Sequence, residues 1–147
     1  MTGIAEQPDA LAAKQAISEL VNRYAQLVRY GRLDETADLY TPGGVFEVRR
    51  GAPDRDEHSV DSREEGREAI RAMLAPSKGK PHPVPLIHNL LVELDGDTAS
   101  GTCVMEGRMS VGEGGFWGEY RDRYAREDGR WYFAARVFTI FDEGSSI

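Results

Sequence analysis

The sequence predicts an α+β domain in which helices come first and a strongly curved, mostly antiparallel sheet follows. In the C-terminal third, alternating apolar runs flank two Asp-Gly pairs, Asp95-Gly96 and Asp128-Gly129, and predict four consecutive strands. An Asp-Gly pair tolerates the positive φ that a tight hairpin requires, so these strands form an antiparallel meander. Between residues 10 and 30 the apolar residues instead fall three and four apart, which is the spacing of one helical face. These positions are Ile17, Leu20, Val21, Tyr24, Leu27 and Val28.

The chain is predicted to begin with a tail. We expect residues 1–9 to be flexible and residues 10–147 to form a single domain. Asp9 is placed to cap the first helix, because its carboxylate can accept hydrogen bonds from the first turn. Pro8 is expected to keep that helix from starting earlier, and Gly31 is expected to end it.

A second helix and a short strand are expected next. The helix runs from Leu33 to Tyr40 and ends before Pro42-Gly43-Gly44, and the strand runs from Val45 to Arg49. Residues 51–62 are polar and rich in turn formers, so they predict a mobile loop that could serve as a lid over a pocket.

A third helix is predicted before the sheet. Ser62 and Glu65 have the spacing of a capping box ahead of a helical stretch that ends at Pro76. The Pro-rich residues 76–85 then predict an extended connection into the first strand of the meander.

The last strand is largely apolar on both of its alternating faces. One face is predicted to line a cavity beneath the helices, and the other needs a cover, most simply a second subunit. We therefore expect a homodimer or a higher homo-oligomer. The two predicted faces are Trp131, Phe133, Ala135, Val137, Thr139 and Phe141, against Tyr132, Ala134, Arg136, Phe138 and Ile140.

Composition excludes several classes of function. The net charge of −7 repels a phosphate backbone, so no nucleic-acid partner is expected. No apolar run is long enough to cross a bilayer, and no membrane partner is expected. The N-terminus lacks the basic start and apolar stretch of a secretory signal, and Cys103 is the single cysteine, which favours a cytoplasmic location without disulfides.

The order of several segments resembles the SnoaL-like branch of the NTF2-like superfamily, which includes scytalone dehydratase-like, bile-acid dehydratase-like and ketosteroid isomerase-like enzymes. The resemblance covers about residues 10–141 and implies a cone-shaped fold whose helices and curved sheet enclose a pocket. It also implies dimers that pair sheet to sheet. The matching segments are Tyr24-Ala25, Leu33–Tyr40, Gly43–Glu47, Gly66–Ile70 and the two Asp-Gly hairpins.

The resemblance suggests where a catalytic base would be. Relatives have a Tyr on the first helix, an Asp five residues later and a His on the first long strand; here Tyr24 fills the first position but Arg29 stands in the second. Arginine cannot accept a hydrogen bond from a His, so the usual His–Asp pair is absent unless Asp34 or another carboxylate replaces it. Arg29 is instead expected at the cavity mouth, pairing with a carboxylate or with an anionic ligand.

His88 is the base candidate, because it is the one His within a predicted strand. The position that relatives use falls on Pro85, so strand alternation puts His88 on the opposite face unless a bulge shifts the register. The alternative is a structural, hydrogen-bonded His. His82 and His58 are weaker candidates.

Two further charged residues are candidates for chemistry. Glu106 follows an apolar run and could act as a general acid or base, or could pair with Arg108 or Arg121. Arg136 matches an Arg that is common in relatives, where it can bind a carboxylate or oxyanion. Its structural alternative is a salt bridge to Asp122 or Glu119.

The remaining candidates are two tyrosines and the apolar residues expected to line the pocket. Tyr24 and Tyr40 can orient or protonate a substrate carbonyl, or serve as core residues with hydroxyls at the rim. The predicted pocket walls, which would select a flat apolar ligand, are Phe46, Met105, Trp117 and Phe138.

No cofactor is expected. The sequence has no Gly-rich phosphate loop, no Cys or His cluster at metal spacing and no nucleophile elbow, and Gly112–Gly115 reads as a hairpin loop. The first hypothesis is a cofactor-independent lyase or isomerase that acts on a small hydrophobic polycyclic or aromatic compound by general acid/base chemistry. The second is a non-catalytic binding protein that uses the same pocket, which Arg29 favours. A third is a small association domain.

Overall fold

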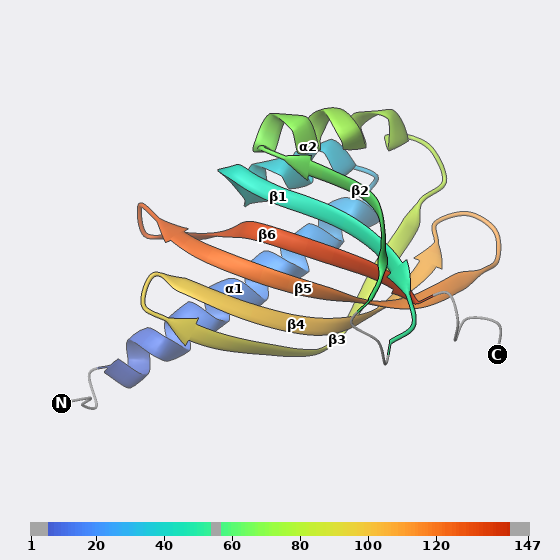
Figure 1. Ribbon diagram of the computed structural model, residues 1–147. Helices are drawn as coiled ribbons and strands as arrows, with labels where there is room; N and C mark the ends of the chain where they lie inside the picture. The colour runs from blue at the N-terminus through green and yellow to red at the C-terminus, as the bar shows by residue number, and fades with distance from the viewer. Residues whose placement is uncertain (1–5, 54–56, 142–147) are drawn as a thin grey trace.

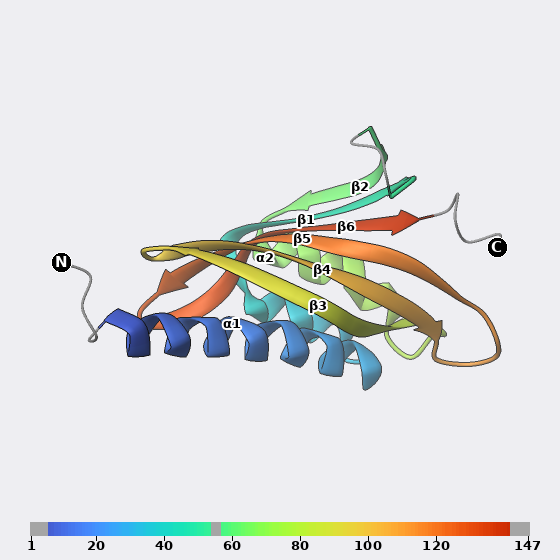
Figure 2. The same cartoon turned by 90° about the horizontal axis from the view of Figure 1, so that it is seen from below.

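The computed structural model describes residues 6–53 and 57–141, and it confirms the predicted α+β fold. A six-stranded sheet in the order β2-β1-β6-β5-β4-β3 is antiparallel except for the parallel pair β1 and β6, and it is not closed. Helix α1 lies across one face of the sheet (Figure 2), here called the inner face, and α2 lies over the β1 end (Figure 1). The helices are α1 (Glu6–Arg29), η1 (Leu33–Leu39), α2 (Arg67–Leu74) and η2 (Ala75–Ser77). The strands are β1 (Tyr40–Gly51), β2 (Ser59–Glu65), β3 (Pro83–Asp95), β4 (Thr98–Met109), β5 (Gly115–Glu127) and β6 (Arg130–Phe141).

Helix α1 forms as the apolar spacing predicts, but it begins earlier. It starts at Glu6, so Asp9 lies inside the helix and is not its cap. A proline in the first turn is tolerated because it lacks only an N–H that has no intrahelical acceptor, and Pro8 therefore does not delay the start. The C-terminal end is as expected: Gly31 adopts φ 75°, and Arg32 N–H donates to the Leu27 carbonyl across it.

The middle of the chain differs from its prediction. The stretch Leu33–Leu39 is a 3-10 helix, and Pro42-Gly43-Gly44 lie within β1 instead of ahead of it. Residues 59–62 of the predicted lid instead lie in the edge strand β2, which pairs with β1. Ion pairs also join this polar strand to β1, with Arg50 Nε 2.6 Å from Asp61 Oδ2. The central residues of that expected lid, 54–56, lie outside the described ranges.

The predicted capping box is also wrong. Ser62 and Glu65 lie in β2, where the neighbouring strand fixes their backbone. Helix α2 begins after Gly66, which adopts φ 99° and has no side chain to cap with. The conformation of Gly66 turns the chain from the sheet edge into the helix.

The meander of four strands, β3 to β6, is confirmed. Gly96 adopts φ 63° in the first turn, and Asp128 and Gly129 adopt φ 52° and 78° in the second. These are the positive values for which Asp-Gly pairs are suited. The hairpin loop around Gly112 is also present between β4 and β5.

A β-bulge changes which residues of β6 share a face. Arg123 pairs with Ala135 but Tyr124 pairs with Phe133, so Ala134 is the extra residue. Phe133 and Arg136 therefore both point to the inner face, although simple alternation places them on opposite faces. The predicted division of β6 into two faces is wrong for this reason.

The core lies between α1 and the inner face. Ile17 and Val21 of α1 have no exposed surface, and they pack in one cluster with Met105 and Phe133 of the sheet. None of the helices in the described part of the chain is long and apolar enough to cross a membrane.

Candidate functional site

The inner face holds a fully buried ion pair. Arg136 Nε donates to Asp122 Oδ1 over 3.0 Å, and neither side chain has any exposed surface. The hydroxyl of Tyr124 donates to the other carboxylate oxygen, Oδ2, over 2.9 Å. Gly101 on β4 leaves room for this phenol, because a Cβ there would lie 2.9 Å from the Tyr124 hydroxyl. Strand β5 thus supplies the acid and the phenol, and the bulge in β6 turns the Arg toward them.

Aromatic rings surround the guanidinium. The guanidinium carbon lies 3.4 Å from the ring centroid of Tyr120, 4.3 Å from that of Tyr24 and 4.6 Å from that of Phe133. Ring faces attract a cation, so they stabilise the charge without accepting all of its hydrogen bonds. We call the following set the Arg136 cluster: Tyr24, Tyr40, Tyr120, Asp122, Tyr124, Phe133 and Arg136.

Three donor groups in this cluster lack an acceptor among the described residues. They are Nη1 and Nη2 of Arg136 and the hydroxyl of Tyr40, all buried. Tyr40 packs against the same rings that flank the guanidinium, with centroids 6.3 Å from Tyr24 and 5.5 Å from Phe133. A buried donor without an acceptor costs about 1–3 kcal/mol. Such groups gathered in one place are typical of a site that receives an acceptor from outside the chain.

The protonation states follow from burial and from the ion pair. Burial raises the pKa of Tyr40 well above its ordinary value and raises the pKa of Cys103 to about 11, so the phenol and the thiol are neutral at pH 7. Burial alone would lower the pKa of Arg136, but the Asp122 carboxylate together with the surrounding tyrosines more than offsets it, and the pKa is raised. Burial also raises the pKa of Asp122, against the opposing effect of Arg136. Asp122 accepts two hydrogen bonds and donates none, as an ionised carboxylate does.

Several predicted site residues come together here. Tyr24, Tyr40 and Arg136 belong to the cluster, and the alternative of a salt bridge between Arg136 and Asp122 is what the structure contains. Three predicted pocket walls also face this interior: Phe46 next to Tyr40, Phe138 next to Tyr120, and Met105, which is 1% exposed.

His88 and Glu106 lie elsewhere, on the outer face of the sheet. His88 Nε2 is 3.6 Å from Glu106 Oε1, and Arg108 Nε donates to Oε2 of the same carboxylate over 2.8 Å. Trp117, expected as a pocket wall, is 50% exposed beside His88. A bulge does occur in β3, but it follows His88, at Asn89 with φ 41°, so it does not turn His88 inward. The predicted base therefore does not share a site with Tyr24 and Arg136.

Arg29 is also outside the cluster. It is exposed in the last turn of α1, where Val28 takes the buried position. Asp34, the considered substitute for the missing acid, lies 3.6 Å from Lys78 Nζ and not near a His.

The other two histidines contact backbone carbonyls. His82 is buried, with Nδ1 2.8 Å from the Lys80 carbonyl oxygen and Nε2 2.7 Å from that of Val28. His58 Nε2 is 3.1 Å from the Ala52 carbonyl oxygen. Both rings thus hold chain segments together.

Sequence reasoning missed Tyr120, Tyr124 and Cys103 as members of this interior. A signal was present in β5, where Tyr120, Asp122 and Tyr124 alternate with exposed Arg residues. A carboxylate between two inward-facing phenols at a spacing of two residues indicates a buried polar network. Across the described ranges, no three His, Cys, Asp or Glu side chains gather as a metal-binding group.

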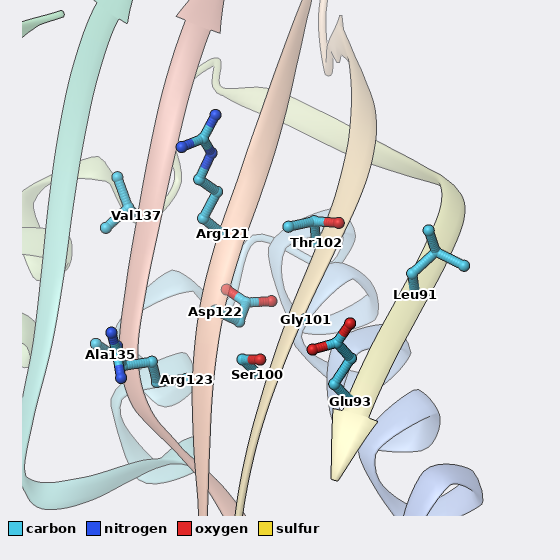
Figure 3. Close-up of a pocket in the computed structure, with 10 residues that line it drawn as sticks. All are labelled: Leu91, Glu93, Ser100, Gly101, Thr102, Arg121, Asp122, Arg123, Ala135 and Val137. Carbon is cyan, nitrogen blue, oxygen red and sulfur yellow. The ribbon is translucent and has the colours of Figure 1, made fainter. Parts of the chain in front are cut away.

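The outer face carries a separate groove of about 500 Å³. Figure 3 shows it across β3 to β6, with α1 behind the sheet. Leu91 at one edge of the groove is 68% exposed, and Arg121 is held by Glu119 over 2.9 Å. The groove is lined by Leu91, Glu93, Ser100, Gly101, Thr102, Arg121, Asp122, Arg123, Ala135 and Val137.

Comparison with known proteins identifies the domain type. The family model of the SnoaL-like domain matches residues 9–137. No functionally curated protein matches the chain.

Solved structures with this fold include a protein of unknown function from Mycobacterium tuberculosis, with 24% identity over 99% of this chain and 81% of that chain and a TM-score of 0.76. An NTF2-like protein with a cystatin-like fold from Novosphingobium aromaticivorans has 20% identity over 99% and 93%, with a TM-score of 0.76. A scytalone dehydratase-like protein from the same organism has 19% identity over 91% and 87%, with a TM-score of 0.68.

Proposed function

The chain belongs to the family of SnoaL-like domains, and on that premise we propose that it binds a small aromatic or polycyclic molecule through a carbonyl or phenolic oxygen. The observation that carries this proposal is the set of three buried donors, Arg136 Nη1, Arg136 Nη2 and the Tyr40 hydroxyl, which have no acceptor in the described chain. A ligand oxygen would supply the lone pairs that these donors lack.

The surroundings of the donors favour a flat, apolar ligand. The rings of Tyr24, Tyr120 and Phe133 border the guanidinium, and Met105 and Phe138 lie next to them. A site with apolar walls and a few convergent donors is typical of small-molecule recognition, in which the walls give affinity and the donors fix orientation.

The ligand must be enclosed by the protein. Because the guanidinium has no exposed surface, a molecule can contact it only after part of the covering structure moves. Association is then slower than diffusion allows, since binding waits for that opening.

A second candidate function, a dehydratase or isomerase, is favoured by the position of Asp122. The Asp122 carboxylate binds the same guanidinium that would bind the proposed ligand. Burial raises the pKa of Asp122, as suits a general base. In this reaction Asp122 takes a proton from the carbon next to the carbonyl, and the electron pair moves onto the oxygen held by Arg136 and Tyr40. In a dehydratase the electrons then return and expel a β-hydroxyl, which leaves as water with that proton. In an isomerase they return and take the proton at a different carbon. The scytalone dehydratase-like neighbour agrees with this class.

The binding proposal is tested by titrating the protein with methyl β-naphthyl ketone, comparing wild type with Tyr40→Phe. The Tyr40 hydroxyl has no partner in the described protein, so its removal leaves the fold intact. Affinity should fall by about three- to tenfold, the equivalent of one hydrogen bond. Leu11→Ala, at an exposed position on α1, is the control and should bind as wild type does. Equal affinities of wild type and Tyr40→Phe would contradict the proposed site.

We also propose that the protein self-associates through the outer face of its sheet. Large apolar side chains are exposed there, with Leu91 at 68%, Trp117 at 50% and Leu86 at 41%. Arg123 and Glu93 line the same groove, so opposite charges are available for a two-fold interface in which each residue meets its counterpart.

A further inference from the structure

We infer that Asp122 makes the Arg136 site selective for electrically neutral ligands. The inference rests on the proposed function and names its ligand class: an uncharged ketone, aldehyde or phenol, and not a carboxylate. It replaces the anionic ligand that Arg29 suggested from sequence, because Arg29 is exposed and takes no part in the cluster.

The interior around Arg136 contains one positive and one negative charge. Asp122 and Arg136 are each fully buried and form one ion pair, so their charges cancel. The other buried charged residue of the described sheet, Glu47, has its own partners, Arg49 at 2.6 Å and Arg63 at 3.3 Å. Burial raises the pKa of the Tyr40, Tyr120 and Tyr124 phenols, which are therefore neutral at pH 7, and they add no charge to that of the ion pair.

The hydrogen bond between Arg136 and Asp122 uses only one side of the guanidinium. Asp122 occupies only the Nε side of the guanidinium, and the two Nη groups keep their donors. A neutral oxygen acceptor can therefore receive hydrogen bonds from a charged donor, which are stronger than those from a neutral one. The Nη groups of Arg136 can therefore donate hydrogen bonds to a ligand, although the positive charge of the guanidinium is already balanced by Asp122.

An anionic ligand is disfavoured in this buried site. A bound carboxylate would leave one net negative charge in an interior where ions are strongly disfavoured, and Asp122 would repel it. An uncharged ligand avoids this cost. An enolate that forms during a reaction also avoids it, since the proton moves to Asp122 as the negative charge moves to the ligand and the net charge of the site stays constant.

The experiment uses two probes of nearly equal shape, methyl β-naphthyl ketone and β-naphthoate, titrated calorimetrically into the full chain. Wild type should bind the ketone at least about tenfold more tightly than the carboxylate. Titrations in two buffers of different ionisation enthalpy should show that β-naphthoate binds with uptake of about one proton, because it enters as the neutral acid. Asp122→Asn removes the carboxylate charge at nearly constant volume, and this variant should prefer β-naphthoate.

Each outcome decides the inference. Ketone preference with proton uptake in wild type, reversed in Asp122→Asn, supports it. Tighter or equal binding of ionised β-naphthoate by wild type overturns it while leaving the binding site in place. If neither probe binds, the proposed function fails and the inference fails with it. Asp122→Asn leaves a buried guanidinium without its counter-charge, so its folding is checked by circular dichroism. If the variant does not fold, the proton uptake measured with wild type decides.

Discussion

The hydroxyl of Tyr124 donates a 2.9 Å hydrogen bond to Asp122, and this contact separates Tyr124 from the otherwise similar Tyr40. Both phenols are buried in the Arg136 cluster, but the Tyr40 hydroxyl has no partner in the described part of the chain. One phenol therefore stabilises the folded protein through its oxygen, and the other does not. This difference gives a direct test of how the cluster is built.

Tyr124→Phe is expected to lower the free energy of unfolding by about 1–3 kcal/mol, because it removes a buried hydrogen bond to a charged group. Tyr40→Phe deletes the same atom from a hydroxyl without a partner and should leave stability unchanged or slightly higher. Urea denaturation of the two variants checks this pair. Equal losses in both variants would mean that Tyr40 also has an acceptor within the protein.

The thiol of Cys103 predicts a dependence of stability on alkaline pH. Burial raises its pKa to about 11 from the ordinary 9.0. Between these values the unfolded chain loses a proton that the folded chain keeps, so the free energy of unfolding falls as pH rises, with the full stability present below pH 9. Cys103→Ala lacks this contribution, and its stability should fall less steeply over the same interval. Denaturation curves of both proteins below pH 9 and near pH 11 test it, and identical slopes would contradict the burial of the thiol.

Self-association through the outer face should depend on Leu91. Leu91→Glu places a charge on the exposed groove of the sheet, whereas Leu11→Glu places the same charge on α1, where the side chain is 69% exposed. Sedimentation velocity is expected to show a dimer for wild type and for Leu11→Glu, and a monomer for Leu91→Glu. A wild type that remains monomeric at tens of micromolar would refute the proposed interface.

His88 and Arg29 are expected to be dispensable for ligand binding. His88 lies on the outer face beside Glu106, and Arg29 is exposed at the end of α1. His88→Ala and Arg29→Ala should therefore bind methyl β-naphthyl ketone with affinities within about twofold of wild type, a difference too small to represent a lost hydrogen bond. A tenfold loss of affinity in His88→Ala would contradict this and would indicate that the ligand binds on the outer face.

The parts of the fold that depend on local signals could be predicted from sequence. The apolar spacing of α1 and the two Asp-Gly turns are determined by a few neighbouring residues, and both are present. The edge strand Ser59–Glu65 could not be found this way, because its sequence is polar apart from Val60 and it forms by pairing with β1.

The candidate site depended on register, which a single sequence does not determine. One extra residue in β6, Ala134, brings Arg136 to the same face as Phe133, and the bulge of β3 follows His88 instead of preceding it. A shift by one residue moves a side chain through the sheet. The family resemblance pointed to Tyr24 and Arg136 as pocket residues, and both belong to the cluster, whereas it did not determine the faces occupied by His88 and Glu106.

The central claim is that Arg136 and Tyr40 donate hydrogen bonds to a ligand oxygen, and the most direct test is the nuclear magnetic resonance signal of a ligand carbonyl carbon. Methyl β-naphthyl ketone labelled at that carbon is bound to wild type and to Tyr40→Phe. Hydrogen bonds from a buried guanidinium and a phenol withdraw electrons from the carbonyl, so the signal should move downfield on binding to wild type and less far in Tyr40→Phe. A bound signal that stays where an apolar solvent places it, in both proteins, would contradict the account.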